Sequence, residues 1–152
     1  MPRRPPLRNS QLVKIHFRLD EGDSGSETMW AEETHPGHFR LENSPFFAFN
    51  VSYQDVVLAK PVGAELVFVE TIRRSGHSTY RLIPVAERGA GFDAAWRPLQ
   101  QLGCTFEEGP DGLLAVDVPP GADIFQAYSA LEDGENQGVW TFEEGHCGHA
   151  VA

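Results

Sequence analysis

The sequence of 152 residues contains little cysteine and no long apolar run. Its 2 cysteines, Cys104 and Cys147, are too few for a disulfide framework, and free thiols are typical of a reducing compartment. No apolar run approaches the ~20 residues that a membrane helix needs. The arginines near the N-terminus are not followed by the apolar region of a secretory signal. We therefore expect a cytoplasmic protein that does not cross a membrane.

Sequence motifs for the common cofactors are also absent. The chain has no G-x-G-x-x-G motif after a predicted strand and no phosphate-binding loop that ends in Gly-Lys-Ser or Gly-Lys-Thr. It also lacks a complete signature of nucleophilic catalysis. We therefore expect no cofactor and favour a binding protein over an enzyme, while catalytic activity stays open as an alternative.

Basic residues are missing from the last third of the chain. Residues 1–97 hold all 12 Lys and Arg and 12 of the 22 Asp and Glu, so the other 10 acidic residues give residues 98–152 the whole net charge of −10. Such a region repels nucleic-acid phosphates, so nucleic acid is a disfavoured partner, and it attracts basic proteins or peptides. The alternative is that the acidic residues only maintain solubility.

The first half of the chain has the pattern of short antiparallel strands. Residues 1–10 are basic and rich in proline, which indicates a mobile arm. In the next stretch Val13, Ile15 and Phe17 alternate with polar side chains, as in a half-buried strand. Similar strand patterns follow at residues 29–31, 39–42 and 53–59 and in the first part of residues 66–85. Together they predict a small, curled, barrel-like sheet over residues 11–78.

Residues 66–85 contain two β-branched apolar runs around a polar centre. Ser75 and Gly76 in that centre favour a tight turn, so the pattern predicts a β-hairpin. Strands precede this hairpin, whereas strands and helices alternate after it. We therefore expect its second arm to join the two halves of the chain.

Two amphipathic helices are predicted in the second half. Phe92, Trp96 and Leu99 share one helical face, and Pro98 predicts a kink or a restart of that helix. Asp123 is a candidate cap for the other helix. That helix is expected to bury one face, which carries Ile124, Phe125, Tyr128 and Leu131.

The order of elements over residues 79–145 is strand, helix, strand, strand, helix, strand. This order predicts a ferredoxin-like β-α-β-β-α-β half. The expected fold class is therefore α+β, with a barrel-like first half joined through the shared hairpin to the ferredoxin-like half. Residues 146–152 are expected to form a C-terminal tail.

The centre of the predicted hairpin is a candidate ligand site. Guanidinium groups bind carboxylate or phosphate through paired hydrogen bonds, and hydroxyl groups complete such sites. The histidine beside the hydroxyls is also compatible with a general base. The alternative is an exposed turn whose arginines pair with the acidic third of the chain. The candidate ligand-binding residues are Arg73, Arg74, Ser75, His77, Ser78 and Arg81.

An aromatic cluster at residues 46–49 is a candidate partner site. Phenylalanine rings are costly to expose, so the cluster is expected either to plug one end of the first half or to form an apolar docking patch. The acidic residues of the last third, read as a surface, favour a basic protein or peptide as the partner. The candidate partner-binding residues are Phe46, Phe47, Phe49, Glu107, Glu108 and Asp111.

The C-terminal tail contains a candidate metal site. His146, Cys147 and His149 carry imidazole and thiolate groups, which are ligands for zinc, copper or nickel. Their spacing matches no standard zinc module, so the alternative is a packed or loose tail.

Four strings carry a resemblance to a known family. They are VKIHFRL at residues 13–19, RLENSPFFAFNVSYQDVV at 40–57, RSGHSTYRL at 74–82 and GVWTFEEGHCGH at 138–149. The chain resembles the bacterial family named domain of unknown function 4265. The resemblance implies a bacterial origin and a single-domain protein, and it transfers no catalytic or binding residue.

The sequence therefore favours a small non-enzymatic binding or regulatory protein that recognises a protein or peptide partner. The alternative is an enzyme or small-ligand-binding protein that uses the arginines and the histidine of the hairpin on an anionic group. The oligomeric state is left open.

Overall fold

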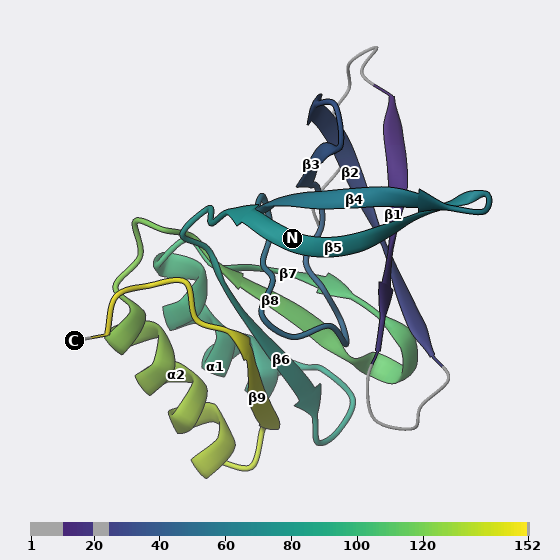
Figure 1. Cartoon of the computed structure of the whole chain (residues 1–152). Coiled ribbons are helices and arrows are strands. Elements are labelled where there is room, and N and C mark those ends of the chain that lie inside the picture. The colour runs from purple at the N-terminus through teal and green to yellow at the C-terminus, as the bar shows by residue number, and fades with distance from the viewer. Residues whose placement is uncertain (1–10, 20–24, 152) are drawn as a thin grey trace.

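The computed structural model describes residues 11–19 and 25–151. It shows a mixed α and β protein with a five-stranded sheet, a four-stranded sheet and two α-helices (Figure 1). The α+β class predicted from the sequence is confirmed in this form. The arm predicted at residues 1–10 lies outside the described residues.

The first sheet contains the first five strands in chain order. They are β1 (Leu12–Arg18), β2 (Ser26–His35), β3 (His38–Leu41), β4 (Val56–Val62) and β5 (Glu65–Arg73). Sequential strands pair antiparallel, and β5 also pairs with β1 in parallel, through Ile15 with Leu66 and His16 with Val67. Alternating apolar side chains point inward, as the strand pattern predicts. The core of this half includes Ile15, Phe17, Met29, Phe39, Leu41 and Val57.

The second sheet is built from the rest of the chain. Its elements are β6 (Ser78–Pro84), α1 (Ala90–Gln101), β7 (Thr105–Glu108), a 3₁₀ turn (Pro110–Gly112), β8 (Leu114–Val118), α2 (Ile124–Asn136) and β9 (Trp140–His146). The strand order is β7-β8-β6-β9, and each neighbouring pair is antiparallel. Both helices cover one face of this sheet, and the first sheet lies on the other side (Figure 1).

Helix α2 begins where the sequence predicts, whereas α1 begins at Ala90, inside the loop predicted up to Gly91. Asp123 caps α2, because its carboxylate accepts hydrogen bonds from the backbone N–H groups of Phe125 and Gln126. Helix α1 continues through Pro98 to Gln101 without a restart. Buried side chains before and after this proline keep the same face of α1 against the sheet.

The predicted hairpin at residues 66–85 is wrong. Strand β5 pairs with β4 and β1, whereas β6 pairs with β8 and β9, so the two apolar runs belong to different sheets. Residues 74–77 form the crossing between the sheets. The prediction failed because two β-branched runs around a glycine have the same local pattern in a hairpin and in a crossing.

The segment between β3 and β4, residues 42–55, packs against the second sheet. Ser52 Oγ and Thr79 Oγ1 are 2.7 Å apart, and Ser44 N–H donates to Glu107 at 2.8 Å. Asn50 N–H donates to the carbonyl of Gly145 at 3.1 Å. The two halves are therefore joined by a network of polar contacts as well as by the chain crossing. Neither described helix is long and apolar enough to cross a membrane.

Candidate functional site

Residues of the crossing form hydrogen bonds with the segment between β3 and β4. Arg74 Nη1 donates to the carbonyl of Asn50 and to Asp55, whose carboxylate is buried. Asp55 also accepts the backbone N–H of Ser75 at 2.8 Å, and Ser75 Oγ–H donates to the carbonyl of Tyr53 at 2.7 Å. These contacts fasten the crossing to the segment between β3 and β4. The predicted ligand residues Arg74 and Ser75 therefore have a structural role here, while Arg73 is exposed.

His77 has an orienting carboxylate. Its Nδ1–H lies 2.8 Å and 2.9 Å from the two carboxylate oxygens of Asp117, and its ring packs edge-on against Tyr53. Such a carboxylate is one part of a general-base arrangement. The neighbouring hydroxyl of Ser78 is directed elsewhere, because it lies 2.6 Å from His149 Nδ1. The structure thus brings two parts of a catalytic arrangement together around His77 and directs the hydroxyl away from it.

Arg81 is buried rather than displayed at a turn. Its Nη2 donates to the carbonyl of Ala48, and its guanidinium lies 4.8 Å from the ring centre of Phe49. Burial lowers the pKa of this guanidinium, and the charges of Glu27 and Glu143 oppose that shift. Alternation along β6 turns the side chain of Arg81 toward residues 42–55, away from the exposed Arg73.

His149 of the tail is hydrogen-bonded within the molecule. His149 Nε2–H donates to the carbonyl of Pro119 at 2.8 Å, so its Nδ1 accepts from Ser78 Oγ–H, which in turn accepts Gly148 N–H at 2.8 Å. Burial, together with the charge of Arg74, lowers the pKa of His146. In the part of the chain that the structure describes, no three His, Cys, Asp or Glu side chains are placed to hold a metal ion. The predicted site of His146, Cys147 and His149 is therefore not assembled.

The aromatic cluster is divided between a packing role and an exposed surface. The ring of Phe46 packs so closely on Gly109 that a Cβ there would lie 2.5 Å from the ring. Phe47 and Phe49 are exposed. Of the acidic residues predicted to bind a partner, Glu107 accepts Ser44 N–H, Glu108 pairs with Arg88 at 3.0 Å, and Asp111 is exposed in the 3₁₀ turn. The half-buried ring of Phe46 therefore packs on the second half, whereas the prediction placed it at one end of the first half, and the three acidic residues have different surroundings.

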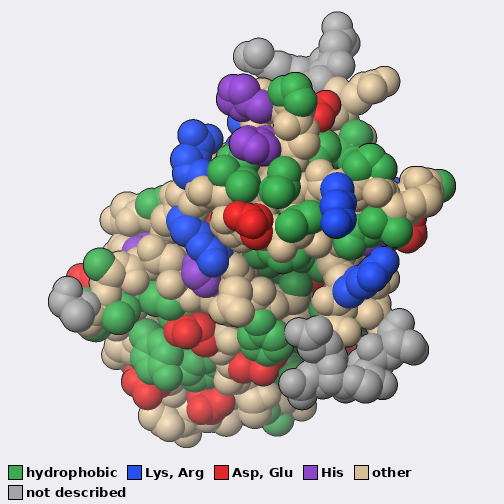
Figure 2. All heavy atoms as spheres, in the orientation of Figure 1, with side chains coloured by type: hydrophobic (Ala, Val, Ile, Leu, Met, Phe, Trp, Pro, Cys, Tyr) green, Lys and Arg blue, Asp and Glu red, His purple; other side chains and the backbone are tan. Residues whose placement is uncertain are grey.

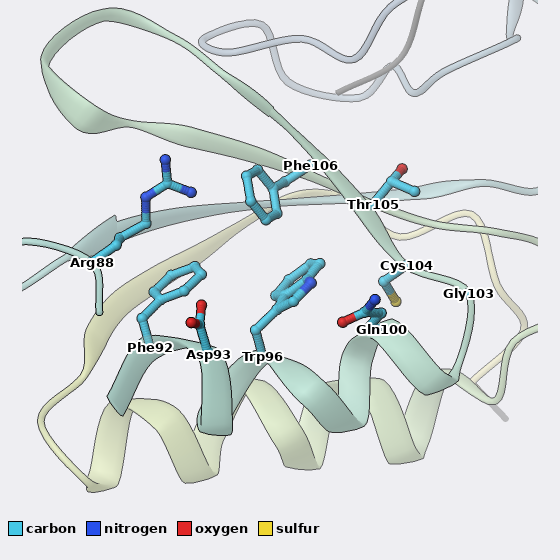
Figure 3. A pocket seen from close by; sticks show the side chains of 9 residues that line it. All are labelled: Arg88, Phe92, Asp93, Trp96, Gln100, Gly103, Cys104, Thr105 and Phe106. Carbon is cyan, nitrogen blue, oxygen red and sulfur yellow. The ribbon is translucent and has the colours of Figure 1, made fainter. Parts of the chain in front are cut away.

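A cavity of about 590 Å³ lies between α1 and β7 (Figure 3). The rings of Phe92, Trp96 and Phe106 face one another across it, and the guanidinium of Arg88 lies 5.4 Å and 5.3 Å from the centres of two of these rings, Phe92 and Phe106. Burial raises the pKa of the Cys104 thiol to about 12. The cavity therefore contains a protonated thiol and aromatic rings that already stack on a cation of the same chain.

A groove of about 400 Å³ lies between α2 and β9, and we call it the α2–β9 groove. Phe125 and Tyr128 of α2 and Val151 of the tail are exposed along it, with 63% of Phe125 accessible. Figure 2 shows this apolar patch over α2, surrounded by acidic side chains. The lining residues are Tyr80, Ile124, Phe125, Tyr128, Ser129, Glu132, Glu144, Cys147 and Val151.

The charged side chains that line the α2–β9 groove are acidic. Tyr80 O–H donates to Glu144 at 3.1 Å, and burial, followed by the charges of Glu144 and Cys147, raises the pKa of Tyr80, so the phenol stays protonated. Glu132 is a second carboxylate in the lining. Since residues 98–152 contain no Lys or Arg, α2 and β9 carry no cation of their own beside these acids.

This groove was not predictable from helical periodicity alone, because that pattern places Phe125 and Tyr128 on the buried face of α2. The face that α2 buries carries smaller residues: Ile124, Ala127, Ala130, Leu131 and Gly134. The small residues Ala127, Ala130 and Gly134, spaced three and four positions apart, are the sequence signal for the buried face of α2. Only small side chains fit there, because α1, β9 and the sheet leave little room beneath this helix.

The sequence model of the family described as Domain of unknown function (DUF4265) matches residues 27–142. The fold is similar to a solved structure described as "Novel crystal structure of a hypothetical protein from Neisseria gonorrhoeae". The TM-score is 0.77 at 18% sequence identity, and the similarity covers 94% of this chain and 100% of that chain. No curated protein matches the chain. The family resemblance of the sequence is confirmed, and the structural similarity shows the fold alone.

Proposed function

We propose that this chain, which belongs to the DUF4265 family, is a non-enzymatic binding or regulatory protein that holds a basic protein or peptide in the α2–β9 groove. The single observation that carries the proposal is an exposed apolar groove with an acidic lining, formed by Phe125, Tyr128, Glu132 and Glu144. Large exposed apolar patches with a polar rim are typical of interaction sites.

We also propose that the fold consists of a barrel-like half and a ferredoxin-like half, and that the second half contains the groove. The parallel pairing of β5 with β1 supports the first part, since it brings the two ends of the five-stranded sheet together. The element order and the strand order β7-β8-β6-β9 support the second part. In this arrangement β9 is an edge strand, and α2 runs beside it.

The chemistry of the groove favours a partner segment with both apolar and cationic side chains. Burial of an aromatic side chain such as Phe125 contributes about 1.5–3 kcal/mol. The carboxylates of Glu132 and Glu144 give charge selectivity and faster association with cations more than affinity itself. We therefore expect a leucine, methionine or aromatic anchor beside one or more lysines or arginines.

The alternative of an anion site at the chain crossing has less support. Its residues Arg74, Ser75 and Ser78 already bond within the molecule, and Arg81 is buried. An orienting carboxylate on His77 does not by itself make a reaction centre, because catalysis also needs a placed nucleophile.

Fluorescence anisotropy with short labelled peptides tests the proposal. One peptide set combines Lys or Arg with Leu, Phe or Trp, and a matched set has Glu in place of the cations. We expect the basic set to bind, the acidic set not to bind, and affinity to fall as salt rises. Phe125→Ser and Glu132→Lys should each weaken binding about tenfold, as loss of roughly 1.4 kcal/mol implies.

Two surface variants away from the groove are matched controls. Val85 is 63% exposed, as Phe125 is, and Glu87 is an exposed acid of the same loop. Val85→Ser and Glu87→Lys should bind the basic peptides as the unchanged chain does. The proposal is wrong if the groove variants bind normally, or if the acidic peptides bind as well as the basic ones.

A further inference from the structure

A third cavity lies in the first half beside the chain crossing, and the charge of its lining is opposite to that of the α2–β9 groove. It has a volume of about 960 Å³, and we call it the junction pocket. Its lining residues are Phe17, Arg18, Leu19, Phe47, Ala48, Phe49, Asn50, Phe68, Thr71 and Arg74. Four aromatic rings and two arginines therefore surround one space.

The apolar wall of the junction pocket comes from two parts of the first half, namely strands β1 and β5 and the segment between β3 and β4. Phe17 of β1 and Phe68 of β5 stack with their ring centres 4.6 Å apart. Phe47 and Phe49 face the same space from the segment between β3 and β4, and both rings are exposed. The exposed rings lie opposite the stacked pair and form an apolar slot between them. An apolar group that enters this slot removes its own surface and that of the rings from water, which favours binding.

The wall that carries Phe47 and Phe49 is fixed in place. The buried carboxylate of Glu27 accepts the backbone N–H groups of Phe46, Phe47 and Ala48. On the opposite side Arg81 donates to the carbonyl of Ala48 and stacks on Phe49. With both sides of this backbone bonded, the pocket is formed before any ligand arrives, which lowers the cost of binding.

The polar part of the junction pocket is cationic. The bonds of Arg74 to described residues both start at Nη1, and its side chain is 47% exposed, so its remaining N–H groups are available on the pocket side. Arg18 contributes a second guanidinium at the end of β1. None of the described residues that line the pocket is acidic. A guanidinium held on one side by Asp55 is suited to a carboxylate or phosphate on the other.

We propose that the junction pocket binds an anionic amphiphile, whose aliphatic chain lies among the four phenylalanines while its carboxylate or phosphate head group contacts Arg18 and Arg74. The charge of the lining excludes the basic partner that we assign to the α2–β9 groove. This inference is independent of that assignment.

Calorimetric titration of the full chain with four probes of equal chain length tests the head group. The probes are dodecanoate, dodecyl phosphate, dodecanol and dodecyltrimethylammonium, each below its micelle-forming concentration. We expect one or both anionic probes to bind at least about tenfold more tightly than the neutral and cationic probes, as a charge-assisted hydrogen bond implies. The tighter anionic probe identifies carboxylate or phosphate as the head group. Equal binding of dodecanol and the anions, or no binding of the anions, would overturn the proposal.

Neighbouring residues of the same type provide matched controls for the pocket. Arg74→Gln and Arg18→Gln should each reduce affinity for the tighter anionic probe about tenfold, while Arg73→Gln, an adjacent exposed arginine outside the lining, should not change it. Phe47→Ser should weaken all probes, whereas Val69→Ser, an exposed apolar residue of β5 outside the pocket, should not. Unfolding curves check that each variant is folded. An Arg18→Gln variant that is folded and binds as tightly as Arg73→Gln contradicts the proposed head-group site.

Discussion

Glu27 and Arg81 hold opposite sides of the segment that carries the phenylalanine cluster. Glu27 is buried in the first half and receives three backbone N–H groups, while Arg81 of the second half binds the carbonyl of Ala48. Two N–H-bearing atoms of Arg81, Nε and Nη1, are buried without a hydrogen-bond partner among the described residues. An unpaired buried donor costs free energy, whereas the carboxylate of Glu27 accepts three N–H groups. Glu27 is therefore the better hydrogen-bonded of the two buried charges.

Glu27→Gln should therefore lower the free energy of unfolding by about 2 kcal/mol. The amide of glutamine places an N–H group where Glu27 now accepts backbone N–H groups, so at least one buried donor loses its acceptor. Urea unfolding measures the change as a lower midpoint at constant slope. Glu70→Gln, at an exposed position of β5, is the control and should change stability by less than about 0.5 kcal/mol. Equal stability of the two variants would contradict the role given to Glu27.

Single residues were predictable where local sequence decides their surroundings. Asp123 caps α2 as expected. The roles of Glu27 and Arg81 were not predictable, since each depends on backbone groups from a distant segment. Local sequence shows which residues carry charge, but it does not show which backbone atoms will surround that charge after folding.

Helix α2 and strand β9 fit together through a glycine. The indole of Trp140 is buried, its Nε1–H donates to the carbonyl of Leu131 at 2.9 Å, and its ring lies directly over Gly134. A Cβ at Gly134 would lie 2.2 Å from the indole, which is far inside van der Waals contact. This close approach turns the small side of α2 toward the core and leaves Phe125 and Tyr128 outside.

Gly134→Ala should therefore destabilise the protein by about 1–3 kcal/mol through overpacking, although alanine favours helix formation. Gly91→Ala in α1 is the matched control, because a Cβ there meets nothing within 4 Å. That control should stabilise the protein by about 0.5–1 kcal/mol. Thermal unfolding of the two variants gives the comparison. A stabilising Gly134→Ala would show that α2 does not pack on Trp140 as described.

The order and type of the elements were largely predictable, because strand alternation, helical periodicity, caps and turns are local signals. The pairing of β5 and β6 was not predictable, since the same pattern fits a hairpin and a crossing. The exposed face of α2 was assigned wrongly because ring size favoured burial of Phe125, whereas the space beneath α2 accepts only small side chains.

Across the whole molecule, the division of charge in the sequence corresponds to two different cavities. The net charge of −10 belongs entirely to residues 98–152, which provide most of the α2–β9 groove, and the arginines of the junction pocket come from residues 1–97, whose charges balance to zero. The charge division and the preference for a basic partner were visible in the sequence. The cavities were not visible, because each is formed by segments that only the folded chain brings together.

We propose that the α2–β9 groove receives a basic, partly apolar segment, and NMR titration of the isotope-labelled full chain with such a peptide tests this proposal most directly. Amide shift changes should concentrate at residues 124–132 and 144–151, follow one saturating curve, and weaken as salt is raised. Shift changes centred on residues 46–50 or 88–106, or no saturable change in any region, would contradict the account.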